Sequence, residues 1–191
     1  MEGIGPIYGR RLMEYFGSFS AVFDRAEKEL TGVSRIPQVL LQRLSSKREF
    51  KFAEAELLQM QKKEVSGHTL SDPRFPKRLK QCSDCPLVLF SKGIADLNAS
   101  RMIAVVGSRA VSQYGEAQCK DLIKGLAGSG VVIMSGLAYG TDIVAHRMAL
   151  ECGLQTIAVF AHGMDRIYPG SHSTTARKML DQGAWVSEFP M

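Results

Sequence analysis

A regular alternation of short apolar runs and helical periods in the second half of the chain constrains the fold most strongly. Runs that are apolar on both faces, separated by segments with apolar residues spaced three and four apart, are typical of a parallel sheet wrapped by helices. Strands are predicted at 102–106, 131–134, 156–160 and 184–186, and helices at 116–126, 143–150 and 174–180. The pattern predicts an α/β fold with a Rossmann-like parallel sheet.

The first third of the chain has a different pattern, with almost no strand signal. Apolar residues are spaced three and four apart over 10–16, 21–30, 37–44 and 50–62. Because the period changes near Val65, we predict a small helical domain at 1–64 and a Rossmann-like domain at 65–191. The opening Gly3-Ile4-Gly5-Pro6 resembles the turn of a helix-hairpin-helix, where amides approach a phosphate, but the same glycines would serve any tight turn.

Composition narrows the functional classes. The chain of 191 residues is 45% apolar and 23% charged, which is the ordinary balance of a globular protein. No apolar run is long enough to span a bilayer and the start lacks the layout of a signal peptide, so we expect a cytoplasmic protein without membrane contact. A formal charge of +5 favours a polyanionic partner, although so small an excess does not decide the matter.

The cysteines predict neither disulfides nor a metal site. Four cysteines are too few and too irregularly spaced for a disulfide framework. Cys82 and Cys85 have the spacing of zinc ligands, but Cys119 and Cys152 stand alone, so no second pair completes a tetrahedral site. We therefore expect no metal and no cofactor.

Small, glycine-containing loops follow three successive predicted strands, at 107–109, 135–142 and 162–165. In open α/β sheets, ligands bind beyond the carboxyl ends of the strands, where backbone amides and helix N-termini favour anions. The sequence therefore predicts a phosphate site at this edge. Its candidate residues are Gly107, Ser108, Arg109, Ser135, Gly136, Leu137, Gly140, Asp142, His146, Gly163, Asp165 and Tyr168.

Several of these residues have two interpretations. Arg109 either reaches the phosphate or is a solvated surface arginine. Asp142 and His146, four residues apart on one helix, either form an acid–base pair or have structural roles, as a cap and a hydrogen-bonded site residue, and the structural roles are favoured. Tyr168 either stacks on a base or closes its loop, and Asp165 either caps a turn or accepts from a ligand hydroxyl.

Catalytic signatures are missing from the sequence. No Gly-x-x-x-x-Gly-Lys loop and no Gly-x-Gly-x-x-Gly fingerprint follows a predicted strand, and no Ser-His-Asp or Cys-His set stands out. We therefore predict no catalytic residues.

Four ordered motifs stand out in the second half of the chain: IAVVGSR from Ile103, SGLAYGTDIVAHRMAL from Ser135, TIAVFAHGMDRIYP from Thr156 and WVSEFP from Trp185. Together they resemble the DNA-processing protein A family, DprA/Smf. The segment 72–93, with Phe75-Pro76 and PLVLFSKG from Pro86, is similar to the lead-in of that family to its first Rossmann strand.

The resemblance implies a helical domain like a SAM or helix-hairpin-helix domain, followed by a Rossmann-like domain that binds single-stranded DNA without catalysis. It also implies protection of incoming single strands during natural transformation, loading of the recombinase RecA, and a homodimer. By position, Arg109 is the arginine expected at the DNA phosphates, and the loops at 135–140 and 162–165 are expected to line the pocket.

The chain departs from the family pattern in three places. Family members often place a lysine directly after the Tyr-Pro pair, where this chain has Gly170, so a second phosphate contact is either absent or taken over by Arg177 or Lys178. The family also continues beyond the position of Met191 with a basic segment and further strands, and usually has a helix before the first glycines. The resemblance therefore implies a fragment or a homologue truncated at the carboxyl end.

Two other functions compete with single-stranded DNA binding. One is a nucleotide-phosphate hydrolase of the lysine-decarboxylase-like (LOG) group, although the Pro-Gly-Gly-x-Gly-Thr loop and following glutamate of that group are missing here. The other is an interaction scaffold that binds only the recombinase. Salt-dependent binding of an unstructured oligonucleotide, without turnover of nucleoside monophosphates, would distinguish DNA binding from both.

Overall fold

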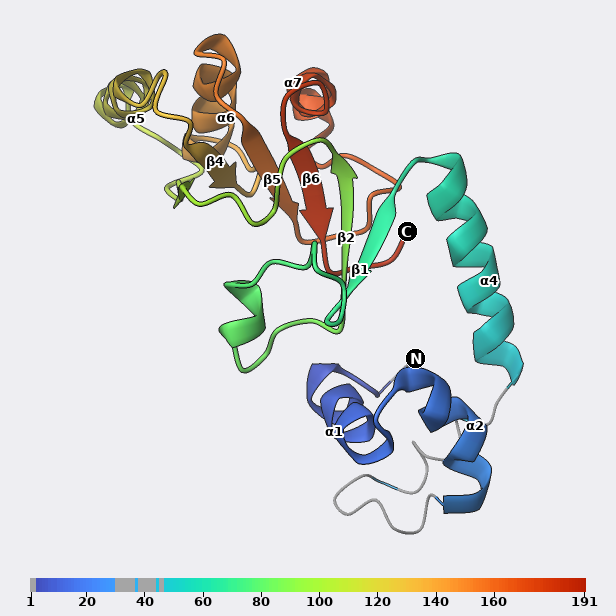
Figure 1. The fold of residues 1–191 in the computed structure, drawn as a ribbon. Helices are drawn as coiled ribbons and strands as arrows, with labels where there is room; N and C mark the ends of the chain where they lie inside the picture. Colours follow the sequence, from blue (N-terminus) through green and yellow to red (C-terminus); the bar gives the residue numbers. More distant parts are fainter. Residues whose placement is uncertain (1–2, 30–36, 38–43, 45–46) are drawn as a thin grey trace.

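The computed structural model describes residues 3–29, 37, 44 and 47–191. The chain opens with three helices, α1 (Pro6–Phe16), α2 (Phe19–Glu29) and α4 (Lys47–Lys62), which overlap three of the predicted helical segments (Figure 1). The helix predicted over 37–44 lies outside the described residues except for its two end positions. The division into two domains near residue 64 stays a prediction.

Helix α1 follows directly from its terminal residues. Pro6 stands at the start of the helix after the N-cap Gly5, where its missing N–H costs nothing. Gly17 ends it with φ of 83°, a left-handed conformation that glycine adopts readily, and its N–H donates to the carbonyl of Met13. The apolar face of α1 packs in a small cluster with Val22 of α2. The glycine-rich opening thus forms a helix start.

The second half forms an α/β sheet, which confirms the predicted Rossmann-like fold class. Four parallel strands follow one another across the sheet in chain order, and a helix joins each strand to the next. The strands are β3 (Met102–Ala104), β4 (Val132–Ser135), β5 (Thr156–Phe160) and β6 (Ala184–Ser187), and the helices are α5 (Gln113–Gly125), α6 (Thr141–Glu151) and α7 (Ser173–Met179).

Among the described residues, the helices between the parallel strands all cover the same face of the sheet. Helices α5, α6 and α7 lie in a row on one face, where they pack on Ile133, Ala158 and Trp185 (Figure 1). The cause is the strand order: each crossover moves one strand further in the same direction, and right-handed crossovers in one direction place their helices on the same side.

The opposite face of the sheet carries a second apolar layer, on which none of the described helices between the parallel strands packs. Val132, Ile157, Ala184 and Val186 are buried there, mainly beneath the irregular segment around Leu97. A cavity of about 420 Å³ remains on this face, lined mostly by apolar side chains.

Two antiparallel strands extend the parallel part of the sheet beyond β6. Strand β2 (Val88–Gly93) pairs with β6, and β1 (Ser66–Thr69) pairs with β2 at the edge. The connection between β1 and β2 holds only turns and a short 3₁₀ helix at Leu79–Gln81, so no crossover helix is available to return the chain in parallel. Strand β1 was not predicted because the sequence Ser-Gly-His-Thr lacks an apolar pattern.

Among the described residues, none of the helices is long and apolar enough to cross a membrane. Within the same part of the chain, no group of three or more histidine, cysteine or acidic side chains is arranged to hold a metal ion. Cys82 is exposed and Cys85 is buried, and burial raises the pKa of the Cys85 thiol.

Candidate nucleic-acid interface

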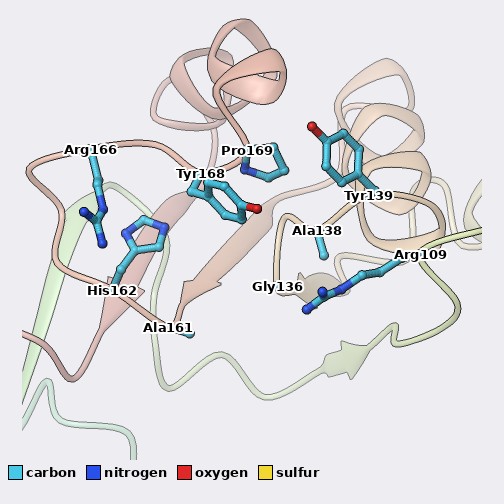
Figure 2. A pocket seen from close by; sticks show the side chains of 9 residues that line it. All are labelled: Arg109, Gly136, Ala138, Tyr139, Ala161, His162, Arg166, Tyr168 and Pro169. Carbon is cyan, nitrogen blue, oxygen red and sulfur yellow. The ribbon is translucent and has the colours of Figure 1, made fainter.

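A pocket of about 580 Å³ lies at the carboxyl ends of β3, β4 and β5 (Figure 2). The loops that follow these three strands all contribute to its wall, at the edge where the sequence predicts an anion site. Its lining residues are Arg109, Gly136, Ala138, Tyr139, Ala161, His162, Arg166, Tyr168 and Pro169.

Two glycines bring the loop after β3 against the start of α6. A Cβ atom on Gly107 would lie 2.4 Å from the hydroxyl of Thr141, and one on Gly140 would lie 2.1 Å from the carbonyl oxygen of Ser108. The Thr141 amide donates to the same Ser108 carbonyl at 3.1 Å. This close approach fixes the backbone beside Arg109 and therefore the direction in which its side chain leaves the loop.

The carboxylate of Asp142 organises the loop after β4. Its Oδ2 accepts hydrogen bonds from the amides of Gly136 at 3.1 Å and Ala138 at 3.2 Å, and its side chain is buried. These two amides are the donors that the glycine-containing loop was expected to offer to a phosphate. Since a carboxylate already satisfies them, these two amides are not free to donate to an anion in the pocket.

The same loop is held on its other side by the residues that precede α7. Leu137 is fully buried with φ of 61°, which is uncommon for a residue with a side chain. Its carbonyl accepts from Nδ1 of His172 at 2.8 Å, and the His172 ring meets the ring of Tyr139 edge-on, with centroids 4.9 Å apart. Tyr139 is thereby presented to the pocket with 50% of its surface exposed.

Two arginines supply the positive charge of the pocket. Arg109 comes from the loop after β3 and Arg166 from the loop after β5, and they lie at opposite ends of the pocket (Figure 2). Both side chains are exposed, and within the described residues neither forms an ion pair. Their guanidinium groups can therefore donate to an anionic ligand without first breaking a contact with a carboxylate.

Aromatic side chains occupy the space between the arginines. Tyr168 is 68% exposed and lies in the middle of the view in Figure 2, with His162 on one side and Tyr139 on the other. His162 stacks on Phe160 with ring centroids 4.9 Å apart, and its Nδ1 donates to the carbonyl of Gly163 at 2.7 Å. The pocket thus combines two charged donors with flat rings, the pair of features that single-stranded nucleic acids require.

Three of the twelve candidate residues line this pocket, namely Arg109, Gly136 and Tyr168. Gly107, Ser108, Gly140 and Asp142 hold the loops together behind it, while Ser135 and Leu137 are buried beneath the loop. Asp165 faces a neighbouring groove, and a Cβ on Gly163 would collide with the carbonyl of Pro190.

The expectation that His146 belongs to the phosphate site has to be corrected. Its side chain is 0% exposed, and its Nδ1 donates to Oγ1 of Thr156 at 2.7 Å, while that hydroxyl donates to the carbonyl of Ile133 at 3.1 Å. Burial lowers the pKa of His146 to about 4, so the ring is neutral in the core. Asp142 uses its carboxylate on backbone amides, and the acid–base alternative for the pair does not match this geometry.

Six lining residues were absent from the candidates: Ala138, Tyr139, Ala161, His162, Arg166 and Pro169. Five of them lie in or directly beside the predicted loops 135–142 and 162–165, and Pro169 lies further along the chain. Arg166 directly follows the loop 162–165, but the local sequence does not indicate that its side chain lines the pocket, because this depends on the course of the loop after β5.

Comparison with known proteins identifies a family that matches this part of the chain. Residues 67–191 match the model of a family described as DNA recombination-mediator protein A. The "Putative DNA processing protein DprA" of Mycobacterium tuberculosis is 44% identical over 115 residues, which cover 59% of this chain and 30% of that protein. The "Protein Smf" of Escherichia coli is 44% identical over 118 residues, covering 61% of this chain and 32% of that protein.

Solved structures resemble the fold as well. DNA processing protein A from Streptococcus pneumoniae aligns with a TM-score of 0.73 at 30% identity, covering 95% of this chain and 62% of that chain. A structure of DNA processing protein A from Helicobacter pylori, described as giving insight into its single-stranded DNA binding mode, aligns with a TM-score of 0.59 at 28% identity over 67% of this chain and 57% of that chain. The chain spans about a third of the length of the first two curated relatives.

Proposed function

The chain belongs to the DNA recombination-mediator protein A family, and on this premise we propose that it binds single-stranded DNA in the pocket at the ends of β3, β4 and β5. The structural relative from Helicobacter pylori is described as binding single-stranded DNA. The observation that carries the proposal is the pocket itself, in which two exposed arginines without a carboxylate partner among the described residues flank exposed tyrosine rings.

The arginines and the tyrosines of the pocket have different proposed roles, which follow from their chemistry. The guanidinium groups of Arg109 and Arg166 donate to phosphate oxygens, which carry no sequence information. Tyr168 and Tyr139 offer faces on which bases stack, and stacking tolerates every base. Binding is therefore independent of sequence, with an affinity that falls as salt rises because bound counterions are released from the DNA.

The loops support binding by holding Arg109 in place before the DNA arrives. Gly107 and Gly140 bring the loop after β3 into contact with the start of α6, and Asp142 satisfies the amides of the loop after β4. A ligand then orders few additional groups, which reduces the entropy cost of binding.

The proposal includes binding without hydrolysis, which distinguishes it from the alternative of a LOG-like nucleotide hydrolase. The support comes from the sequence, in which the Pro-Gly-Gly-x-Gly-Thr loop and the following glutamate of that group are missing, and none of the residues that line the pocket is a carboxylate. Nucleoside monophosphates should accordingly remain intact after incubation with the protein.

The resemblance and the family description support a finer role, in which the bound strand is protected and transferred to the recombinase RecA by a homodimer of the protein. We expect wild-type protein to accelerate assembly of RecA on an oligonucleotide, and Arg109→Ala to lose this acceleration together with DNA binding. Filament assembly followed by fluorescence would measure it, and equal acceleration by both proteins would contradict the role.

Replacing Arg109 with alanine tests the proposed function directly. The variant should bind single-stranded DNA more weakly by roughly 1 to 3 kcal/mol, the range for a hydrogen bond to a charged group. The slope of log affinity against log salt should flatten by about 0.7, the value for one lost phosphate contact on a single strand. A salt titration with two oligonucleotides of different sequence measures both quantities.

Arg101→Ala provides the matched control. Arg101 is an exposed arginine at the opposite end of β3, where it donates to the carbonyl of Ser129, far along the strand from the pocket edge. Its loss removes the same charge but no proposed phosphate contact, so the salt slope should stay near the wild-type value. Equal slopes and affinities for wild type and Arg109→Ala, with the fold intact, would reject the site.

A further inference from the structure

A second positively charged groove lies beside the pocket. It has a volume of about 620 Å³, and five of its lining residues are basic while one is acidic. The charged lining residues are Lys62, Lys63, Lys92, Asp165, Arg166 and Arg177. They come from the end of α4, from β2, from the loop after β5 and from α7, so the tertiary structure alone brings them together.

Not all of these cations are available to a ligand. Lys92 donates from Nζ to the carbonyl of Lys63 at 2.6 Å and lies 3.7 Å from the carboxylate of Glu64, so it fastens the end of α4 to β2. Arg166 and Arg177 are exposed, and among the described residues neither takes part in an ion pair. Their positive charge therefore faces the groove.

Arg166 connects the two cavities, because it lines both of them. A strand whose phosphate contacts Arg166 in the pocket is therefore at the mouth of the groove. The groove has no exposed aromatic ring among its lining residues, since Trp185 is 7% exposed beneath it. Its chemistry suits phosphates and offers nothing to a base.

We propose that the groove lined by Lys62, Arg166 and Arg177 is a second subsite, which holds the phosphate backbone of the same single strand as it leaves the pocket. This inference rests on the proposed function. The pocket would then hold bases and phosphates together, whereas the groove adds phosphate contacts only. The extra contacts become available once the strand is long enough to reach past Arg166.

Two adjacent residues of α7 offer a matched test. Arg177 lines the groove, whereas its neighbour Lys178 is equally exposed but does not line it. Arg177→Gln and Lys178→Gln each remove one positive charge from the same helix without placing an apolar group on the surface. Lys62→Gln tests the opposite wall of the groove, at the end of α4.

The experiment compares oligothymidylates of about 4 and about 16 nucleotides, a range of typical site sizes on single-strand binding proteins. Arg177→Gln and Lys62→Gln should each weaken binding of the longer strand about tenfold and flatten its salt slope by about 0.7, and together they should flatten it by about 1.4. The shorter strand, measured by competition at low salt, should bind Arg177→Gln and Lys62→Gln as tightly as wild type. Lys178→Gln should match wild type with both lengths.

Two outcomes would overturn the inference, and they differ in what they mean for the pocket. If Arg177→Gln and Lys178→Gln behave alike with the longer strand while Arg109→Ala still weakens both lengths, the pocket binds DNA and the groove does not. If wild type binds neither length, the proposed function fails and the groove proposal fails with it. Thermal unfolding of each variant checks that the exposed substitutions leave the fold intact.

Discussion

Replacing Gly140 with alanine is expected to lower the free energy of unfolding by about 2 to 5 kcal/mol. Gly140 precedes α6 with φ of 74° and ψ of −125°, a conformation that side chains rarely adopt. An added Cβ would also lie 2.1 Å from the carbonyl oxygen of Ser108 and 2.6 Å from that of Arg109. Backbone strain and overlap with a neighbouring backbone therefore add to each other.

Gly153→Ala separates the two causes. Gly153 follows the other end of α6 with φ of 67°, but an added Cβ there meets no atom within 4 Å. This control should lose only the cost of the left-handed conformation, about 1 to 2 kcal/mol. Urea unfolding of both variants measures the difference. Equal losses at the two glycines would show that the contact between the loop after β3 and α6 contributes nothing.

Gly140→Ala should also weaken binding of single-stranded DNA in the fraction that remains folded. The alanine must push the segment with Ser108 and Arg109 away from α6, and this displaces the guanidinium from the pocket. Gly153→Ala should bind like wild type, because Gly153 lies at the far end of the helix from the pocket.

The stability of the protein is expected to fall by about 2 kcal/mol between pH 7.5 and pH 5 because of His146 alone. Burial is the main cause that lowers its pKa to about 4, the nearby Asp142 opposes the shift, and His172 adds to it. In the unfolded chain this ring takes up a proton near the ordinary histidine pKa of 6.5, whereas in the folded chain it does not. The contribution of His146 to the free energy of unfolding is therefore fully present above pH 6.5, and it declines as the pH falls toward the pKa of the folded state.

The variant His146→Gln isolates this contribution. It removes the titrating ring, and its amide can still donate to the hydroxyl of Thr156, which accepts from His146 in the wild type. The difference in unfolding free energy between wild type and variant should shrink by about 2 kcal/mol on going from pH 7.5 to pH 5, as measured by chemical denaturation at each pH. A difference that does not depend on pH would mean that the ring has the same pKa in the folded and unfolded protein, and the neutral, buried state of His146 would then be wrong.

The same variant also tests the corrected role of His146. Because the ring lies in the core and not in the pocket, folded His146→Gln should bind single-stranded DNA with wild-type affinity at pH 7.5. If the folded variant binds single-stranded DNA more weakly than wild type, His146 contributes to binding and the correction is wrong.

The order of strands and helices from β3 to β6 was predictable because it depends on local patterns. An apolar run such as 156–160 and the helical period that follows it are set by residues a few positions apart, and strand β5 occupies those five residues. The place of Arg109 was predictable for the same reason, since it directly follows a strand and a glycine. Strand β1 was not, because a four-residue edge strand with polar side chains leaves no apolar period.

The roles of Asp142, His146 and Arg177 were decided by tertiary structure, because each depends on a neighbour that is distant in sequence or set by the turn of a loop. Asp142 meets the amides of the loop after β4 only when that loop folds back over the start of α6. His146 reaches Thr156 because β5 runs beneath α6, and this contact places the ring in the core. Arg177 joins Lys62 in one groove because the sheet brings α7 near the end of α4, a proximity that depends on strand order and that no local period encodes.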